Sequence, residues 1–268
     1  MNLFSYGYMV RALWVGALLG IVIPSLGLIV VNKRVSMIGD ALSHVSLAGV
    51  MGGLILGVNP ILGALVIAVV AGLGLEAVAK RFPGYGEMAT AIVMSTGVGL
   101  ASILSGYVRG AVNIESFLFG SIVAITDFEW WMILAMSILV LAASLFFYRP
   151  LLYSTFDPVG ARLFGVHLAW VDRLFMVLTA LVVALASRTV GVLMISSLMV
   201  LPVAASMRFR LGYWKSMLLS GAIGLFMTLS GLVIAFYTGL KPGGTLVLLG
   251  VVILLFSILI TNRKSPSL

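Results

Sequence analysis

The sequence contains no cysteine among its 268 residues. Disulfides, thiolate metal sites and thiol nucleophiles are therefore excluded. Charged residues are also scarce: they make up 9% of the chain, against about 25% in an average soluble domain. With 62% hydrophobic residues, the chain has too little charge to cover a water-exposed surface, and we predict a protein embedded in a membrane.

Motifs of several enzyme classes are absent as well. The chain has no GxxxxGKS or GxxxxGKT phosphate-binding loop, no HExxH metalloprotease motif, no GxGD motif and no GxSxG nucleophile elbow. The net charge of +8 is spread over pairs of basic residues, without the long basic run that binds nucleic acid. We therefore expect no enzymatic activity and no nucleic-acid partner, and any energy-coupling ATPase must be a separate chain.

Apolar stretches long enough for a transmembrane helix recur from end to end. We expect residues 1–268 to form one all-α domain, a polytopic transmembrane helical bundle with about nine spans. Eight spans are possible, because the sixth and seventh stretches meet at "SRTVGVLM". A shorter apolar segment, 116–125, is interpreted as a re-entrant or interfacial piece. The expected spans are residues 10–31, 38–57, 61–79, 88–106, 129–147, 174–193, 192–207, 216–237 and 244–261.

The basic residues predict the orientation of these spans, because cytoplasmic loops of membrane proteins are enriched in lysine and arginine. With the N-terminus outside and the C-terminus in the cytoplasm, 12 of the 16 basic residues lie on the cytoplasmic side. The opposite orientation would reverse that ratio. The four that lie outside are Arg11, Arg109, Arg188 and Lys241.

The longest cytoplasmic loop, residues 148–173, mixes apolar and charged residues at helical spacing. This pattern predicts short amphipathic helices, with Asp157 at an N-cap position and with turns at Gly160 and Gly165. Two interpretations are open. The helices lie on the lipid surface, or they form a docking surface for a cytosolic partner.

An acidic residue and a histidine lie within the second expected span, in "SMIGDALSHVSL" at 36–47. Asp40 and His44 are four residues apart, so they share one helix face with their Cβ atoms about 6 Å apart. Polar residues are costly inside a span, and a carboxylate with an imidazole can bind zinc or manganese. The simpler interpretation is that Asp40 caps the helix and His44 forms a hydrogen bond with it.

Two other sets of polar residues have structural interpretations. Glu76 and Lys80 are also four residues apart, and we interpret them as an ion pair at the membrane interface. His167 lies in the cytoplasmic loop and is interpreted as a surface histidine.

Five segments resemble the membrane subunits of ABC importers for zinc and manganese. The signature of that family, Gly-Asp-x-x-x-His after a basic residue, matches "RVSMIGDALSHVSLAGV" at 34–50. The resemblance covers most of the chain in the family's order. The other segments are "NPILGALV", "ESFLFGSIVAIT", "TFDPVGARLFGV" and "TVGVLMISSLMVLPVAASMRF".

The resemblance implies the permease subunit of an ATP-driven importer of divalent metal ions, with a modest preference for zinc and with manganese or iron as the alternative ion. Its fold would be similar to that of cobalamin and iron-chelate importers, in the cytoplasmic (inner) membrane of a prokaryote. It implies a homodimer, a cytosolic ATP-binding subunit, an extracytoplasmic metal-binding protein and no permanently bound cofactor. Asp40 and His44 would line the metal pathway. The ATPase would dock on the loop at Asp157, Pro158, Ala161, Arg162, Leu163 and Gly165.

The sequence departs from the family at Ser121, where relatives often have aspartate. Glu115 and Asp127 are expected to replace that carboxylate at the outer mouth. Asp40 is also expected near the shallow, cytoplasmic end of its span, a position that an earlier helix start would deepen. The alternative is a secondary transporter that works without ATP, which would need further buried carboxylates for ion coupling.

Overall fold

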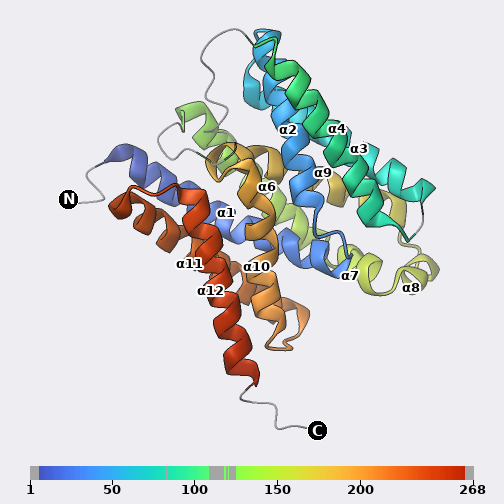
Figure 1. The fold of residues 1–268 in the computed structure, drawn as a ribbon. Helices are drawn as coiled ribbons and strands as arrows, with labels where there is room; N and C mark the ends of the chain where they lie inside the picture. Colours follow the sequence, from blue (N-terminus) through green and yellow to red (C-terminus); the bar gives the residue numbers. More distant parts are fainter. Residues whose placement is uncertain (1–5, 83, 109–117, 119, 121–124, 263–268) are drawn as a thin grey trace.

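The protein is a bundle of helices (Figure 1). The computed structural model describes residues 6–82, 84–108, 118, 120 and 125–262, and in these ranges it contains helices and no strand. The predicted all-α class is confirmed. The helices are α1 (Gly7–Asn32), α2 (Ile38–Ile55), α3 (Pro60–Arg81), α4 (Gly86–Ser105), α6 (Asp127–Phe146), α7 (Tyr148–Phe156), α8 (Pro158–Leu163), α9 (Leu168–Thr189), the 3-10 helix η2 (Val192–Met194), α10 (Ile195–Met207), α11 (Tyr213–Thr238) and α12 (Pro242–Asn262).

Eight of the described helices are long and apolar enough to cross a membrane. They are α1, α2, α3, α4, α6, α9, α11 and α12, which correspond to eight of the nine expected spans. The seventh expected span is instead the turn η2 followed by α10, which has only 13 residues. At about 1.5 Å per residue, α10 is about 20 Å long, and a hydrocarbon core is about 30 Å thick. Most of segment 116–125 lies outside the described residues.

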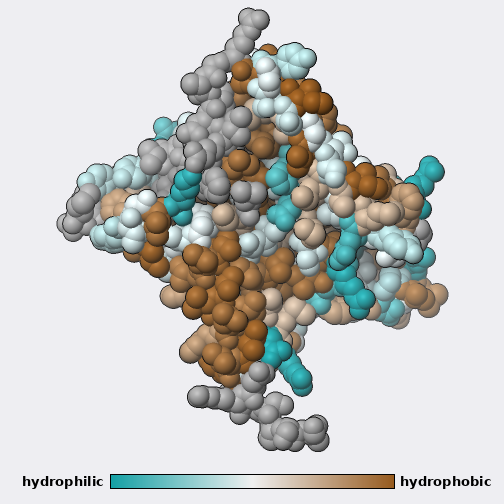
Figure 2. Space-filling view, in the orientation of Figure 1, coloured by the Kyte–Doolittle hydropathy of each residue, from teal (hydrophilic) through white to brown (hydrophobic). Residues whose placement is uncertain are grey.

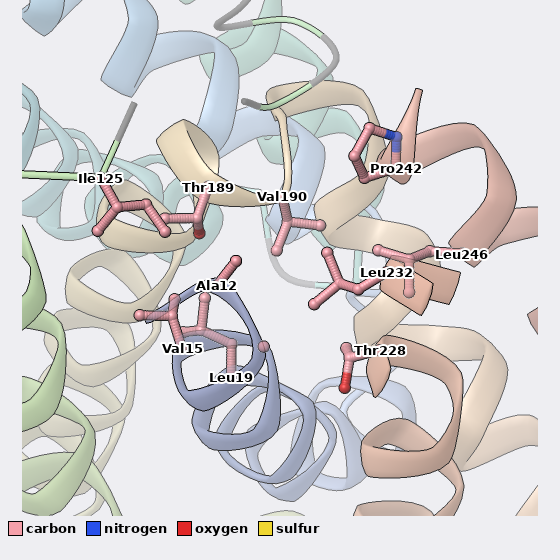
Figure 3. Close-up of a pocket in the computed structure, with 11 residues that line it drawn as sticks. Ala12, Val15, Leu19, Ile125, Thr189, Val190, Thr228, Leu232, Pro242 and Leu246 are labelled. Atoms are coloured by element: carbon pink, nitrogen blue, oxygen red, sulfur yellow. The ribbon is translucent and has the colours of Figure 1, made fainter. Parts of the chain in front are cut away.

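The short helix α10 still carries the chain from one end of the bundle to the other. Val190, just after α9, lines an apolar pocket with Leu232 near the end of α11 and Pro242 at the start of α12 (Figure 3). α11 begins at its opposite end with Tyr213, which lies about 38 Å along the helix axis from the last residue of α11, Thr238. The chain reverses at Gly191, whose φ of +103° favours glycine, and then runs through η2 and α10. Within the described residues, the bundle is therefore crossed by eight long helices and once more by η2 and the short helix α10.

The helices form two closely packed groups, which Figure 1 shows on opposite sides of the molecule. In one group, α2 packs on α3 and α4, and α3 packs on α9. Gly49 and Gly63 bring the α2 and α3 backbones so close that a Cβ on Gly49 would lie 2.5 Å from the Gly63 carbonyl oxygen. In the other group, α1 packs on α10 and α11, where Gly20 and Gly224 make a similar approach.

Large apolar side chains cover much of the outer surface. Figure 2 shows hydrophobic residues gathered over α12. A soluble protein buries such residues, but lipid solvates them, so this surface fits a bilayer. The residues of α12 that are exposed in this way are Leu248, Val251, Val252, Leu255, Phe256 and Leu259.

Candidate functional site

Asp40 lies in the first turn of α2, which begins at Ile38 as the sequence predicted. The N-cap residue is Met37 and makes no side-chain cap hydrogen bond, so the capping interpretation of Asp40 is wrong. As the third residue of the helix, Asp40 places a negative charge near the positive end of the helix dipole, which stabilises the carboxylate.

Asp40 and His44 form a partly open stripe on an otherwise buried helix. Gly39, Ala41 and Ser43 are buried, whereas Asp40 and His44 are only half-buried. Among the described residues, neither the carboxylate nor the imidazole has a hydrogen-bond or ion-pair partner. Within the part of the chain that the structure describes, the pair therefore makes no structural hydrogen bond through its side chains.

The depth of Asp40 is set by helix α10. The preceding residue, Gly39, packs on Ser196, the second residue of α10: a Cβ on Gly39 would lie 3.0 Å from the Ser196 hydroxyl oxygen. From Ser196, α10 runs another 11 residues to Met207, about 17 Å, before it reaches the basic residues Arg208 and Arg210. Measured along α10, the position of Asp40 is therefore about 17 Å from these basic residues, although α2 does not start earlier than predicted.

The unwound segment between α9 and α10 lies beside the same part of α2. The Ser43 hydroxyl donates within α2 to the Asp40 carbonyl oxygen at 2.9 Å and also lies 3.2 Å from the Val192 carbonyl oxygen in η2. The Ser46 hydroxyl donates to the Ser43 carbonyl oxygen at 2.8 Å and lies 3.3 Å from the Ser187 hydroxyl in the last turn of α9. Irregular backbone at membrane depth occurs where it is buried in protein or lines a cavity. These polar contacts place α2 against the end of α9 and the turn η2 that follows it.

A carboxylate and an imidazole would offer one oxygen and one nitrogen ligand, a combination that suits zinc or manganese. The described residues contain no group of three or more histidine, cysteine or acidic side chains placed to hold a metal ion. A tight structural site needs about four ligands. Two ligands from one chain would make only a weak site, the kind that an ion can leave as well as enter.

The loop that the sequence assigned to the cytoplasmic side contains two short helices, α7 and α8. Asp157 is the N-cap of α8, and its carboxylate accepts a hydrogen bond from the Gly160 N–H at 2.8 Å, as the sequence predicted. Gly165 ends the helix with a φ of +77°. The N–H of Val166 donates to the Ala161 carbonyl oxygen, and the N–H of Gly165 to that of Arg162, which together form a Schellman motif.

One face of α8 is inside the protein and the other faces outward. Ala161 is only 3% exposed, whereas Leu163 is 83% and Phe164 is 90% exposed. Pro158 is the first residue of α8. Of the residues expected to contact an ATPase, Ala161 thus anchors α8 to the bundle, and Leu163 is accessible to a partner.

Comparison with known proteins agrees with these features. The family model of the ABC 3 transport family matches residues 5–261. The chain belongs to the ABC 3 transport family. The resemblance drawn from the sequence is thereby confirmed.

Relatives and a solved structure match the chain over almost its whole length. A "Probable metal transport system membrane protein" of Treponema pallidum (strain Nichols) is 31% identical over 97% of this chain and 98% of its own. The "Manganese import system permease protein ScaB" of Streptococcus parasanguinis is 30% identical over 98% of this chain and 94% of its own. A chain of PsaBC from Streptococcus pneumoniae, solved in complex with Fab, has a TM-score of 0.85 at 26% identity, covering 95% of this chain and 92% of that chain.

Other acidic residues of this family member are engaged in structural contacts. Glu76 is buried and forms an ion pair with Lys80, as predicted, while its carboxylate also lies 3.7 Å from Arg173 Nε. Sequence reasoning missed Glu129, which is buried in the first turn of α6 and completes a capping box with Thr126. Both carboxylates have protein partners.

Two acidic residues, Glu115 and Asp127, were expected at the outer mouth of the pathway. Asp127 forms an ion pair with Arg11 at 2.6 Å on the exposed surface. Ser121 and Glu115 lie outside the described residues. His167 is exposed at the start of α9, as expected of a surface histidine.

Sequence reasoning also missed an ion pair between Lys33 at the end of α1 and Asp172 in α9, with 2.5 Å between Nζ and Oδ1. Each residue was assigned to the cytoplasmic side. Their separation of 139 positions gave no local signal that they meet.

Proposed function

We propose that this chain is the permease subunit of an importer of divalent metal ions, driven by a separate ATP-binding subunit. The observation that carries the proposal is the Asp40–His44 stripe, which is half-buried and has no hydrogen-bond or ion-pair partner among the residues that the structure describes. An acidic residue and a histidine are costly at this depth unless they have a function. Membership in an ABC transport family supports the ATP-binding partner.

The proposed ion is Mn²⁺ ahead of Zn²⁺. One carboxylate and one imidazole bind either ion, so the ligand pair alone does not separate them. The sequence favoured zinc modestly, through its general likeness to zinc permeases. The relative named for manganese import, 30% identical over 98% of this chain, favours manganese.

The proposed assembly has two copies of this chain around a central pathway. One copy supplies two ligands, and a second copy related by two-fold symmetry would bring the total to four, enough to complete a coordination shell. An ATP-binding subunit would dock on the exposed face of α8, and an extracytoplasmic protein would deliver the ion. We propose no resident cofactor, because the metal ion is the transported substrate.

The direct test is metal uptake by the reconstituted transporter. This chain and its ATP-binding subunit are placed in lipid vesicles, and entry of ⁵⁴Mn²⁺ or ⁶⁵Zn²⁺ is measured with and without ATP on the side of α8. Uptake that requires ATP is expected. Uptake that proceeds equally without ATP would instead favour the secondary transporter.

We further propose that the N-terminus faces outward and the C-terminus faces the cytoplasm of a prokaryotic inner membrane, as the positive-inside rule indicates. Single cysteines can be introduced at exposed sites, because the native chain has none. An impermeant thiol reagent added to intact cells is expected to label Val58→Cys and Leu240→Cys, and to leave Tyr85→Cys and Val159→Cys unlabelled until the cells are opened. The reverse labelling pattern would contradict the orientation.

A further inference from the structure

Two consecutive residues at the beginning of α9 connect this helix to two different neighbours. Asp172 pairs with Lys33 at the end of α1, at 2.5 Å. Arg173 lies 3.7 Å from the carboxylate of Glu76 in α3. Successive residues of a helix point about 100° apart, so one turn of α9 reaches both α1 and α3, the helices that precede and follow α2.

The Lys33–Asp172 pair is partly shielded from water. The side chains of Lys33 and Asp172 are 17% and 34% exposed, and Lys33 Nζ also lies 5.5 Å from the centre of the Phe175 ring. By contrast, the side chains of the Arg11–Asp127 pair on the outer surface are 46% and 80% exposed. Water and salt screen a shielded ion pair less than an exposed one. Removing one of the two charges is therefore expected to have a larger effect at Lys33–Asp172 than at Arg11–Asp127.

The pair joins the region next to the docking helix to the region next to the metal ligands. Asp172 lies in the second turn of α9, which begins shortly after α8 ends at Leu163. Lys33 is the C-cap residue of α1. The turn that follows leads directly into α2, where Asp40 and His44 occupy the first two turns.

The same turn is one covalent connection between the two packed groups of helices, and the segment from α9 through η2 to α10 is another. α1 belongs to the group with α10 and α11, and α2 to the group with α3 and α4. Asp40 lies where these groups meet, because the adjacent Gly39 packs on Ser196 of α10. A displacement of α9 transmitted through Lys33 would therefore move one side of the metal pathway relative to the other.

We propose that the Lys33–Asp172 ion pair is the positioning contact that transmits movement of the α8 docking helix to the Asp40–His44 metal pair. The contact of Arg173 with Glu76 holds the adjacent helix α3 to the same turn of α9, so that the two flanks of α2 move together. The proposal rests on the function proposed above. Neither Lys33 nor Asp172 needs to touch the ion.

The test measures the number of Mn²⁺ ions imported per ATP hydrolysed by the complete transporter in lipid vesicles. In Lys33→Met and in Asp172→Asn, the ATPase is expected to stay bound and hydrolyse ATP, while this ratio falls about tenfold, within the usual range of coupling between sites. The charge exchange Lys33→Asp with Asp172→Lys is expected to restore part of the ratio. The matched control is Arg11→Gln, which breaks an ion pair of the same type on the outer surface and should leave the ratio unchanged.

The double variant Lys33→Met with Asp172→Leu separates coupling from stability. Replacing both charges by apolar side chains avoids an unpaired buried charge, so the protein is expected to fold normally. A folded double variant with a low ratio supports the proposal, and one with the wild-type ratio overturns it. If the wild-type transporter itself imports Mn²⁺ without ATP, the proposed function fails, which is a distinguishable result.

Discussion

Replacement of Asp40 by alanine, or of His44 by alanine, is expected to reduce metal uptake at least about 100-fold while the protein still inserts and assembles. Loss of groups that only orient a metal ligand already costs about 10–100-fold, and each of these residues is proposed to bind the ion directly. The structure adds a reason to expect normal folding: among the described residues, neither side chain has a hydrogen-bond or ion-pair partner that the substitution would remove. The measurement is uptake of ⁵⁴Mn²⁺ at matched expression.

Two control substitutions distinguish ion binding from general effects. Glu87 is an exposed acidic residue in the first turn of α4, just as Asp40 is an acidic residue in the first turn of α2. His167 is the second histidine of the chain and is exposed. Glu87→Gln and His167→Ala should both retain uptake. Wild-type uptake by Asp40→Ala and His44→Ala would exclude the pair as metal ligands.

Leu163→Glu is expected to release the ATP-binding subunit and to stop ATP-driven uptake. Leu163 is 83% exposed on the outward face of α8, where a partner groove would bury it. Placing a charge at the centre of such a contact costs about 2 kcal/mol or more, which corresponds to a loss of affinity of about 30-fold. The measurements are co-purification of the ATPase and uptake with internal and external ATP controls.

The choice of residue follows from the structure. From the sequence, Ala161→Glu and Leu163→Glu are equivalent tests of docking. Because Ala161 is buried, glutamate at this position would displace α8 itself, and a loss of binding there would not identify the contact surface.

The matched control is Leu211→Glu, which makes the same change at another exposed leucine in the loop between α10 and α11. It should leave the ATPase bound. If α8 instead lies on lipid, Leu163→Glu would impair membrane insertion while the ATPase stays bound, and that result would contradict the docking role.

Features that depend on residues close together in the chain could be predicted from the sequence. The spanning helices follow from apolar stretches of sufficient length, and Ile38 was identified as the start of α2. The one helix face shared by Asp40 and His44 follows from their spacing of four residues. The capping role of Asp157 also follows from its position before a short helical pattern.

Features that depend on contacts between distant segments required the tertiary structure. The depth of Asp40 comes from Gly39 packing on Ser196, more than 150 positions away, and not from the length of α2. The Lys33–Asp172 pair spans 139 positions, and its two residues carry no local pattern that distinguishes them from the other charges in the loops. The burial of Ala161 beside the exposed Leu163 depends on how α8 lies against the bundle. Hydrophobicity and helical periodicity are local properties of a chain, whereas depth, burial and ion pairing are set by which helices pack together, because long-range packing decides which face of each helix meets protein and which meets lipid or water.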